Sequence, residues 1–116
     1  MFCLGIESTA HTFAASVIEY VDIDCSNNMD SLKKLGNFHA QILSDSRDIY
    51  RPPEGSGIHP RLASRHHAEV SAKVLKDCIK ESGLHIGDID IIAYSAGPGL
   101  GPCLRVGAVV SRTLAA

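Results

Sequence analysis

Short apolar runs and polar turns alternate through the first half of the chain. Residues 2–6 form a continuous apolar run that stops at Glu7, which is typical of a buried strand followed by a polar turn. A β-type pattern resumes at residues 12–18, so the two runs are predicted to pair as a hairpin whose turn spans residues 7–11. Residues 39–46 form a third strand with a weaker pattern.

Two segments of this half are predicted to be loops. Residues 20–37 are rich in Asp, Asn, Ser and Lys, which solvate well and pack poorly, so we interpret them as an extended hairpin loop. Residues 51–57 contain prolines and glycines, through which a helix does not persist.

The clearest helix spans residues 60–82. Pro60 is tolerated in the first turn of a helix, and Gly83 accepts the left-handed conformation that ends one. Apolar positions recur every three to four residues, which predicts a face that lies on the sheet. That face is formed by Leu62, His66, Val70, Val74 and Cys78, with Ala63, Leu75 and Ile79 alongside.

A fourth strand and a second helix follow near the end of the chain. Residues 90–96 predict another buried strand, and glycines and prolines close it at residues 97–102. Residues 103–116 predict a helix whose apolar residues cover more than one face, so we expect it to be buried between layers or against a partner. Ala116 comes without a helix stop signal, and we expect the intact protein to continue beyond it.

The predicted order is strand, strand, strand, helix, strand, helix. It begins as an antiparallel meander and continues through parallel crossover connections, which predicts an α/β fold with a ribonuclease-H-like mixed sheet. The 116 residues fit one domain, and 45% apolar with 21% charged residues is an ordinary globular composition.

Charge and cysteine content narrow the class of protein. A formal net charge of -2 argues against a protein whose whole surface binds nucleic acid. The cysteines are widely spaced, include no C-x-x-C pair and follow no signal peptide, which favours free thiols in the cytoplasm. No apolar run approaches the roughly 18 residues that a membrane span requires, so we expect no membrane association.

The turn after the first strand is the first candidate for chemistry. Glu7 at the end of a buried strand, followed by Ser8 and Thr9, would present a carboxylate and backbone N–H groups to a phosphate. A polar hairpin turn that needs its hydroxyls only for internal hydrogen bonds explains the same residues.

The loop after the later strand is the second candidate. Gly97, Pro98 and Gly99 lie between a strand and a helix, where glycines let the backbone approach a ligand and the helix N-terminus favours an anion. Ligands of open α/β sheets bind beyond the carboxyl ends of the strands, which fits this position. A proline-stiffened loop without a ligand is the alternative.

The remaining polar residues form no further constellation. Adjacent His66 and His67 point about 100° apart on a helix, so we assign no metal site in this chain and expect His66 to pack on the core and His67 to make a local hydrogen bond. Arg105 and Arg112 lie on nearly one helix face, which suits a solvated edge, an acidic partner or RNA.

Taken in order, the motifs resemble the tRNA threonylcarbamoyladenosine synthase family, the catalytic subunit of the KEOPS complex, formerly called an O-sialoglycoprotein endopeptidase. The resemblance covers nearly the whole chain except residues 20–37, and two of its segments, STAHT and LRV, are similar to the archaeal and eukaryotic cytosolic branch. It is carried by residues 4–12 (LGIESTAHT), 57–60 (GIHP), 64–69 (SRHHAE), 88–90 (DID), 96–100 (AGPGL) and 104–107 (LRVG).

The resemblance implies a fold, an activity and a site. Members have two actin-like lobes and transfer threonylcarbamoyl from threonylcarbamoyl-adenylate to the adenosine beside the anticodon of tRNA. Residues 1–116 would form part of the first lobe without the second, and we expect them to be inactive alone. Glu7 would be catalytic, and Ser8, Thr9, Gly97, Pro98 and Gly99 would bind the phosphate side of the substrate. The intact protein would hold one divalent metal, iron or zinc, on ligands outside this chain.

The resemblance also implies partners and a location. A small dimerising KEOPS subunit would pack on the helices at 60–82 and 103–116, a kinase-like subunit would bind elsewhere, and the protein would be cytoplasmic, and also nuclear in a eukaryote. Two other interpretations stay open: a module that only binds the small subunit through its helices, and another actin-like ATPase or sugar kinase. The second is disfavoured because those proteins usually carry Asp at the position of Glu7.

Overall fold

A computed structural model describes residues 1–22 and 38–116 of the chain. Within these residues, four strands form one sheet in the order β3-β2-β1-β4, and two helices cover it. The elements are β1 (Phe2–Glu7), β2 (Thr12–Asp22), β3 (Phe38–Ile49), α2 (Pro60–Ser82), a short 3-10 turn (Ile86–Asp88), β4 (Ile91–Tyr94) and α3 (Gly101–Ala115). The predicted order and the mixed α/β sheet are confirmed.

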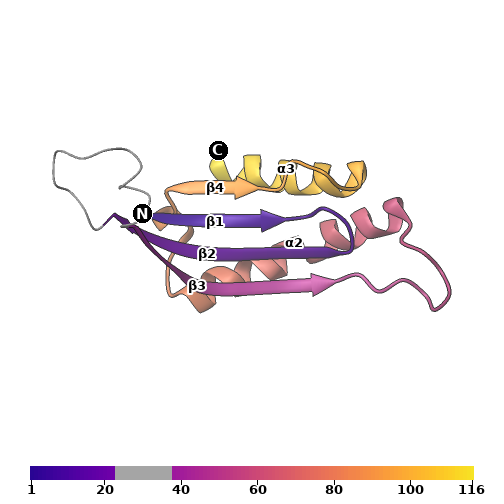
Figure 1. The fold of residues 1–116 in the computed structure, drawn as a ribbon, viewed down its shortest axis with the longest axis horizontal. Coiled ribbons are helices and arrows are strands. Elements are labelled where there is room, and N and C mark those ends of the chain that lie inside the picture. Colours follow the sequence, from indigo (N-terminus) through magenta and orange to yellow (C-terminus); the bar gives the residue numbers. More distant parts are fainter. Residues whose placement is uncertain (23–37) are drawn as a thin grey trace.

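The sheet is antiparallel on one side of β1 and parallel on the other. β1 pairs with β2 in antiparallel register, Leu4 opposite Val17, and with β4 in parallel register, Leu4 opposite Ile92. Both helices lie on the same face, α2 against β2 and β3 and α3 against β1 and β4 (Figure 1). The carboxyl ends of β1 and β4 therefore meet at one edge of the sheet.

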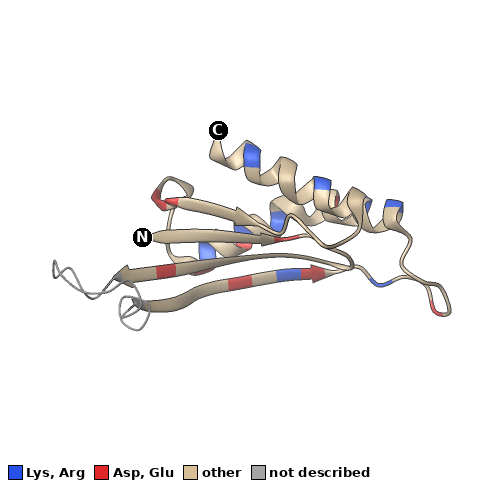
Figure 2. Ribbon diagram, turned by 45° about the horizontal axis from the view of Figure 1, so that its top comes forward, with Lys and Arg blue, Asp and Glu red and all other residues tan. Residues whose placement is uncertain are grey.

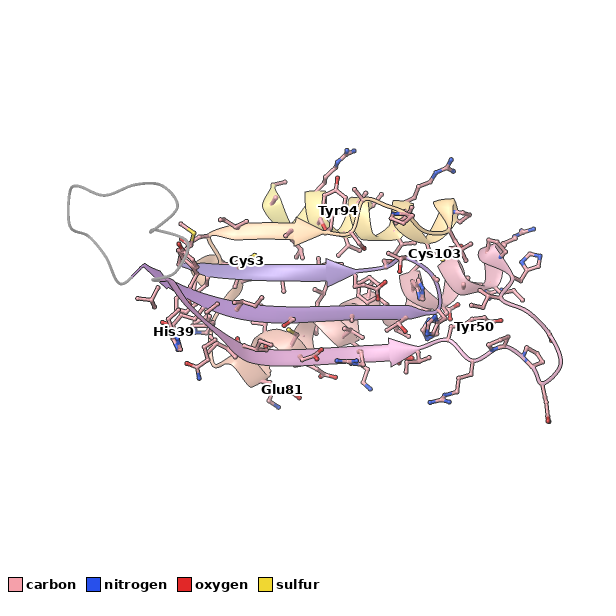
Figure 3. All side chains as sticks on the ribbon, viewed as in Figure 1. Cys3, His39, Tyr50, Glu81, Tyr94 and Cys103 are labelled. Carbon is pink, nitrogen blue, oxygen red and sulfur yellow. The ribbon has the colours of Figure 1, made fainter. Side chains whose placement is uncertain are left out.

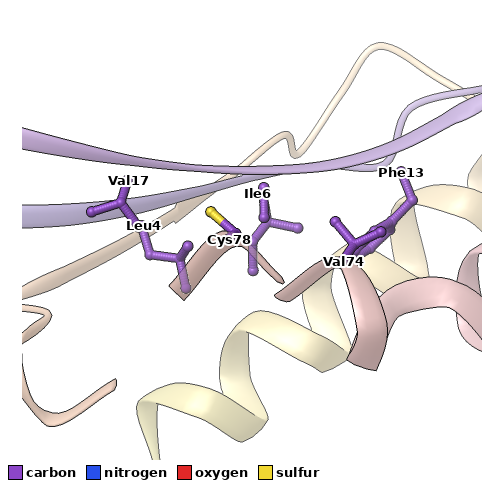
Figure 4. Close-up of a cluster of buried hydrophobic side chains, with 7 residues drawn as sticks. Leu4, Ile6, Phe13, Val17, Val74 and Cys78 are labelled. Atoms are coloured by element: carbon purple, nitrogen blue, oxygen red, sulfur yellow. The ribbon is translucent and has the colours of Figure 1, made fainter. Parts of the chain in front are cut away.

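The hydrophobic core lies between the sheet and the helices. Alternate residues of the strands point toward the helices, as the period of two along a strand requires. Figure 4 shows the side chains of β1 and β2 facing those of α2 across this layer. The cluster consists of Leu4, Ile6, Phe13, Ala15, Val17, Val74 and Cys78, each at most 4% exposed.

Helix α2 has the predicted bounds, and Val74 and Cys78 of the predicted face are buried, but in the first half of the helix the buried face is turned by one residue. The fully buried residues include Ala63 and His67, whereas Leu62 is 46% exposed and His66 lies at the margin of the core. Gly83 ends the helix with φ of 77°, as predicted. His66 was predicted to pack on the core, but His67 takes the buried position. The His67 ring reaches the Ala10 carbonyl oxygen in the interior, whereas the His66 ring reaches the carboxylate of Asp48, whose side chain is 41% exposed.

Helix α3 begins two residues earlier than predicted and carries small residues toward the sheet. Cys103, Gly107 and Ser111 are its buried residues, and a Cβ on Gly107 would lie 3.1 Å from the Cβ of Ser8. The small residues therefore let the helix axis approach β1 closely. No other described residue covers the opposite side of the helix, where Val109 is 63% exposed. The only charged residues of α3 are basic (Figure 2).

The strand ends differ from the predicted ones. β2 continues through Asp22 and β3 through Ile49, so residues 20–22 of the predicted hairpin loop are strand. The rest of that loop, residues 23–37, lies outside the described residues. β4 is shorter than predicted, and Asp90 before it accepts a hydrogen bond from the Phe2 N–H at 2.8 Å. Neither helix of the described residues is long and apolar enough to cross a membrane.

Candidate functional site

Two loops meet at the edge of the sheet where β1 and β4 end. The Ser95 N–H donates to the Ile6 carbonyl oxygen at 3.0 Å, and the Ser8 N–H donates to the Ser95 hydroxyl at 3.1 Å. Farther along, the Leu100 N–H donates to the carbonyl oxygen of Thr9 at 2.7 Å. The turn after β1 and the loop after β4 are thus joined at both of their ends, and the candidate residues lie in one place.

Glu7 holds the turn after β1 through its own carboxylate. Its Oε1 accepts a hydrogen bond from the Thr9 N–H at 2.8 Å and a second one from the Thr9 hydroxyl. Its Oε2 has no hydrogen-bond partner among the described residues. Glu7 also lines a hollow of about 300 Å³, with Gly5, Ala14, Ser16 and Ala93 of the sheet face opposite α2 and α3.

Ser8 faces the interior of the molecule. Its side chain is fully buried, and its hydroxyl donates to the carbonyl oxygen of Cys103 in α3 at 2.8 Å. Because the N–H groups of Ser8 and Thr9 both donate within the protein, neither is free for a ligand in this conformation. These two residues order the site from within.

The loop after β4 contains the backbone N–H groups that could donate to a ligand. Within the described part of the chain, the N–H groups of Gly97 and Gly99 donate to no other group. The first turn of α3 follows directly, and no side chain caps the helix at Leu100. Free backbone N–H groups next to a helix N-terminus favour an anion, since the partial positive charge of the helix lies there.

Cys103 lies in the first turn of α3 against the turn after β1, toward the same end of the sheet as Tyr50 (Figure 3). Burial raises the pKa of the Cys103 thiol above its usual value, and the negative charge of Glu7 raises that pKa further. A thiol with a raised pKa is a poor nucleophile. Cys103 therefore serves structure: its Sγ donates to the Ala10 carbonyl oxygen at 3.5 Å, across to the turn after β1.

His67 of α2 also reaches this turn, and His66 links His67 to β3, which the sequence pattern did not reveal. His67 is fully buried, and its Nε2 contacts the Ala10 carbonyl oxygen at 2.7 Å, 57 residues earlier in the sequence, instead of making the predicted local bond alone. His66 contacts Asp48 of β3 through Nε2 at 2.8 Å. Burial lowers the pKa of His67, although the hydrogen bond to Ala10 opposes this.

The described residues do not fit the metal that the resemblance implies. Nowhere in residues 1–22 and 38–116 do three His, Cys, Asp or Glu side chains gather in a way that would hold a metal ion. The histidine nitrogens nearest the site are engaged by Asp48, by the Ala10 carbonyl and by each other.

The sheet order and the two joined loops define a mixed α/β domain of the ribonuclease-H-like class. A family model described as tRNA N6-adenosine threonylcarbamoyltransferase matches residues 39–116. Curated proteins of that name from Ignicoccus hospitalis and Hyperthermus butylicus are 46% and 47% identical to this chain over all 116 residues. The chain belongs to the tRNA N6-adenosine threonylcarbamoyltransferase family. It spans 30% and 27% of the length of those two relatives.

Solved structures support the fold at much lower sequence identity. The structure of YeaZ from Pseudomonas aeruginosa superposes with a TM-score of 0.59 at 15% identity, covering 99% of this chain and 40% of that one. A second structure, of an uncharacterized protein with similarity to peptidase YEAZ from Pseudomonas aeruginosa, gives a TM-score of 0.60 at 16% identity over 98% of this chain and 38% of that one. At this identity the likeness concerns the fold alone.

Proposed function

We propose that this chain forms the part of a tRNA adenosine threonylcarbamoyltransferase that holds the phosphate side of threonylcarbamoyl-adenylate. The observation that carries the proposal is the junction of the two loops at the carboxyl ends of β1 and β4. Three hydrogen bonds, from the N–H groups of Ser8, Ser95 and Leu100, join the loops, so their relative position is set before any ligand arrives. Preorganised donors of this kind stabilise charge that develops during a reaction.

In the proposed reaction, the exocyclic amine of the tRNA adenosine attacks the threonylcarbamoyl carbonyl carbon. The bond from that carbon to the phosphate oxygen breaks, adenylate leaves with the electron pair, and the amine loses a proton. The free N–H groups of Gly97 and Gly99, with Pro98 holding the loop between them, would bind the phosphate as negative charge collects on it. Ser8 and Thr9 would support this site by fixing the turn that packs on the loop.

Glu7 is the residue we propose as catalytic. Its Oε1 orders the turn, and its unpartnered Oε2 lies at the shared edge of β1 and β4, where it would accept the proton of the attacking amine. General-base assistance contributes about 100-fold to 10,000-fold in rate.

Glu7→Gln tests this role with little disturbance of the fold. The amide oxygen of glutamine still accepts both hydrogen bonds from Thr9, while the second oxygen becomes an NH2 group that accepts no proton. Transfer of labelled threonylcarbamoyl to tRNA by the transferase that contains this chain, with its partners supplied, should fall at least about 100-fold. Glu19→Gln, at the far end of the same hairpin, should keep full activity. Normal transfer by Glu7→Gln would remove Glu7 from the proposed mechanism.

The helices support a partner surface that is separate from this site. Between α2 and α3 lies a groove of about 300 Å³ lined by Ala68, Ser71, Arg105, Val106, Val109 and Val110. Apolar side chains next to one basic residue, on a helix face that none of the described residues covers, suit a protein partner. We propose that the small dimerising KEOPS subunit binds here, with the kinase-like subunit on another surface, in the cytoplasm.

A module that only binds the small subunit remains the second candidate function, favoured by the same groove. NMR titrations of the chain with the small subunit and with a hydrolysis-resistant acyl-adenylate analogue distinguish the two candidate functions. The transferase proposal expects amide shifts at Gly97 and Gly99 with the analogue, and unshifted Gly55 and Gly87 as internal controls. Binding of the subunit, with no response of the two loops to the analogue, would favour the interaction module.

A further inference from the structure

A chain of polar contacts connects the surface of β3 to the turn after β1. Asp48 Oδ1 lies 2.8 Å from His66 Nε2, and His66 Nδ1 lies 2.9 Å from His67 Nδ1. His67 Nε2 lies 2.7 Å from the carbonyl oxygen of Ala10. All three distances are those of hydrogen bonds, so each contact needs one proton between its two heavy atoms.

Counting those protons gives the charge of the histidine pair. The Ala10 carbonyl only accepts, so His67 Nε2 carries a proton. The Asp48 side chain is 41% exposed, which supports its ionised form, so His66 Nε2 carries a second proton. A third proton lies between the two Nδ1 atoms. Two neutral imidazoles hold two protons, and three protons therefore give the pair one positive charge.

The environments of the two rings decide which one carries the charge. His67 is completely buried and packs against Phe13, with ring centroids 6.1 Å apart, and its pKa is lowered mainly by burial. The His66 side chain is 17% exposed and touches the Asp48 carboxylate, and the ring of Tyr50 lies 5.6 Å from it between centroids. A carboxylate and an aromatic ring both favour a cation.

We infer that His66 is an imidazolium that donates to Asp48 and to neutral His67, and that this relay positions the Ala10 carbonyl and with it the turn from Glu7 to Ala10. His66 and His67 are positioning residues, because among the described residues their only hydrogen bond to a candidate loop is the one from His67 to that carbonyl. The same carbonyl accepts from Cys103 of α3, so it ties α2, α3 and β3 to one peptide group. The protonation assignment is independent of the proposed function, and only its use in ordering a phosphate site depends on it.

The charged and titratable groups around the relay come from every element that packs on it. Glu7 of β1 and Asp48 of β3 place negative charge near His67, and His66 on the same helix opposes its protonation. Tyr50 after β3 faces His66, and the Cys103 thiol of α3 shares the Ala10 carbonyl. Loss of the extra proton leaves a bare nitrogen lone pair facing either the Asp48 carboxylate or the other ring, so one of the three hydrogen bonds breaks.

Nitrogen-15 NMR of the imidazole side chains in the full chain tests the assignment directly. At a pH near the ordinary histidine value of about 6.5, we expect both His66 nitrogens to carry protons and His67 to carry one, on Nε2. As the pH is raised and the extra proton leaves, protection of the Leu100 N–H from exchange should fall roughly tenfold, since one charge-assisted bond is lost. A neutral His66 throughout, or a proton on His67 Nδ1, would overturn the inference.

Asp48→Asn provides the matched change. Asparagine donates from its NH2 group to His66 Nε2, so all three contacts form with a neutral pair and the extra proton is no longer required. The imidazolium signal of His66 and the pH step in Leu100 protection should both disappear, while His67 keeps its tautomer. Asp45→Asn, on the same strand and paired with Arg47, should change neither signal. An imidazolium at His66 that survives Asp48→Asn would show that Asp48 does not hold the charge.

Discussion

A Cβ atom on Gly99 would lie 2.7 Å from the carbonyl oxygen of Thr9 and 3.0 Å from its Cα. The two backbones are therefore in direct contact, and the next residue, Leu100, donates its N–H to the same Thr9 oxygen. Glycine at position 99 is what allows the loop after β4 to rest on the turn after β1. The contact depends on backbone atoms, so a neighbouring side chain cannot relieve a clash by rotating.

Gly99→Ala should separate the two loops. Because the added methyl group meets backbone, we expect a loss of about 1–3 kcal/mol in the free energy of unfolding, the usual cost of overpacking. Chemical denaturation followed by circular dichroism measures this loss. Gly101→Ala is the matched control, since no described atom outside its own helix turn lies within 4 Å of the added Cβ, and its effect should stay within about 0.5 kcal/mol. Equal stability of the two variants would mean that the loops do not touch as described.

The local sequence pattern was sufficient to predict the helix at 60–82. Its signals all lie in or next to that segment: Pro60, Gly83 and the apolar period. The pattern was insufficient for the choice between His66 and His67, since one step along the helix moves the buried face by about 100° and both residues are histidine. The deciding group is the Ala10 carbonyl, which no local pattern connects to the helix.

The candidate site, too, was predicted only in part from the sequence. Glu7 and Gly99 were predicted to lie together because parallel strands place their carboxyl ends at one edge, and the structure has them there. The burial of Ser8 was not predicted, because its hydroxyl is satisfied by Cys103, 95 residues later in the sequence. Sequence reasoning therefore located the loops but not which of their hydrogen-bond donors are already used.

Acid should destabilise the chain through His67. Burial lowers the pKa of His67 in the folded chain below the ordinary 6.5, so below about pH 6.5 the unfolded chain binds the proton more readily. The free energy of unfolding should then fall as the pH falls, with a slope of at most about 1.4 kcal/mol per pH unit from this residue. Urea denaturation at several pH values measures the slope.

The matching variants are His67→Gln and His39→Gln. His67→Gln removes the group that titrates, so it should flatten the pH dependence even if it lowers stability at every pH. His39 is exposed on β3, and its replacement should leave the slope unchanged. If His67→Gln keeps the full slope of the unmodified chain, the acid sensitivity comes from another group.

Thiol reactivity should differ among the three cysteines of the described residues. Burial raises the pKa of both Cys78 and Cys103, and only the thiolate reacts with an alkylating reagent. Cys3 lies on the sheet face without helices and is partly exposed. Iodoacetamide at about pH 8 should therefore modify Cys3 at least roughly tenfold faster than the other two. Peptide mass spectrometry follows each site, and the same reaction in urea, where the rates should converge, is the control.

The groove between α2 and α3 should be the contact surface for the proposed small subunit. Val109 is 63% exposed on α3 and lines that groove, so Val109→Asp places a charge in the apolar contact without entering the core. Affinity for the small KEOPS subunit should fall about 30-fold or more, the effect of losing a central contact of about 2 kcal/mol, while the unfolding midpoint stays unchanged. Ile42→Asp is the control, because Ile42 is 67% exposed on β3, away from the groove. Calorimetric titration of both variants decides the matter: unaltered binding by Val109→Asp would place the subunit on another face, and equal losses in both variants would point to a general effect of charge.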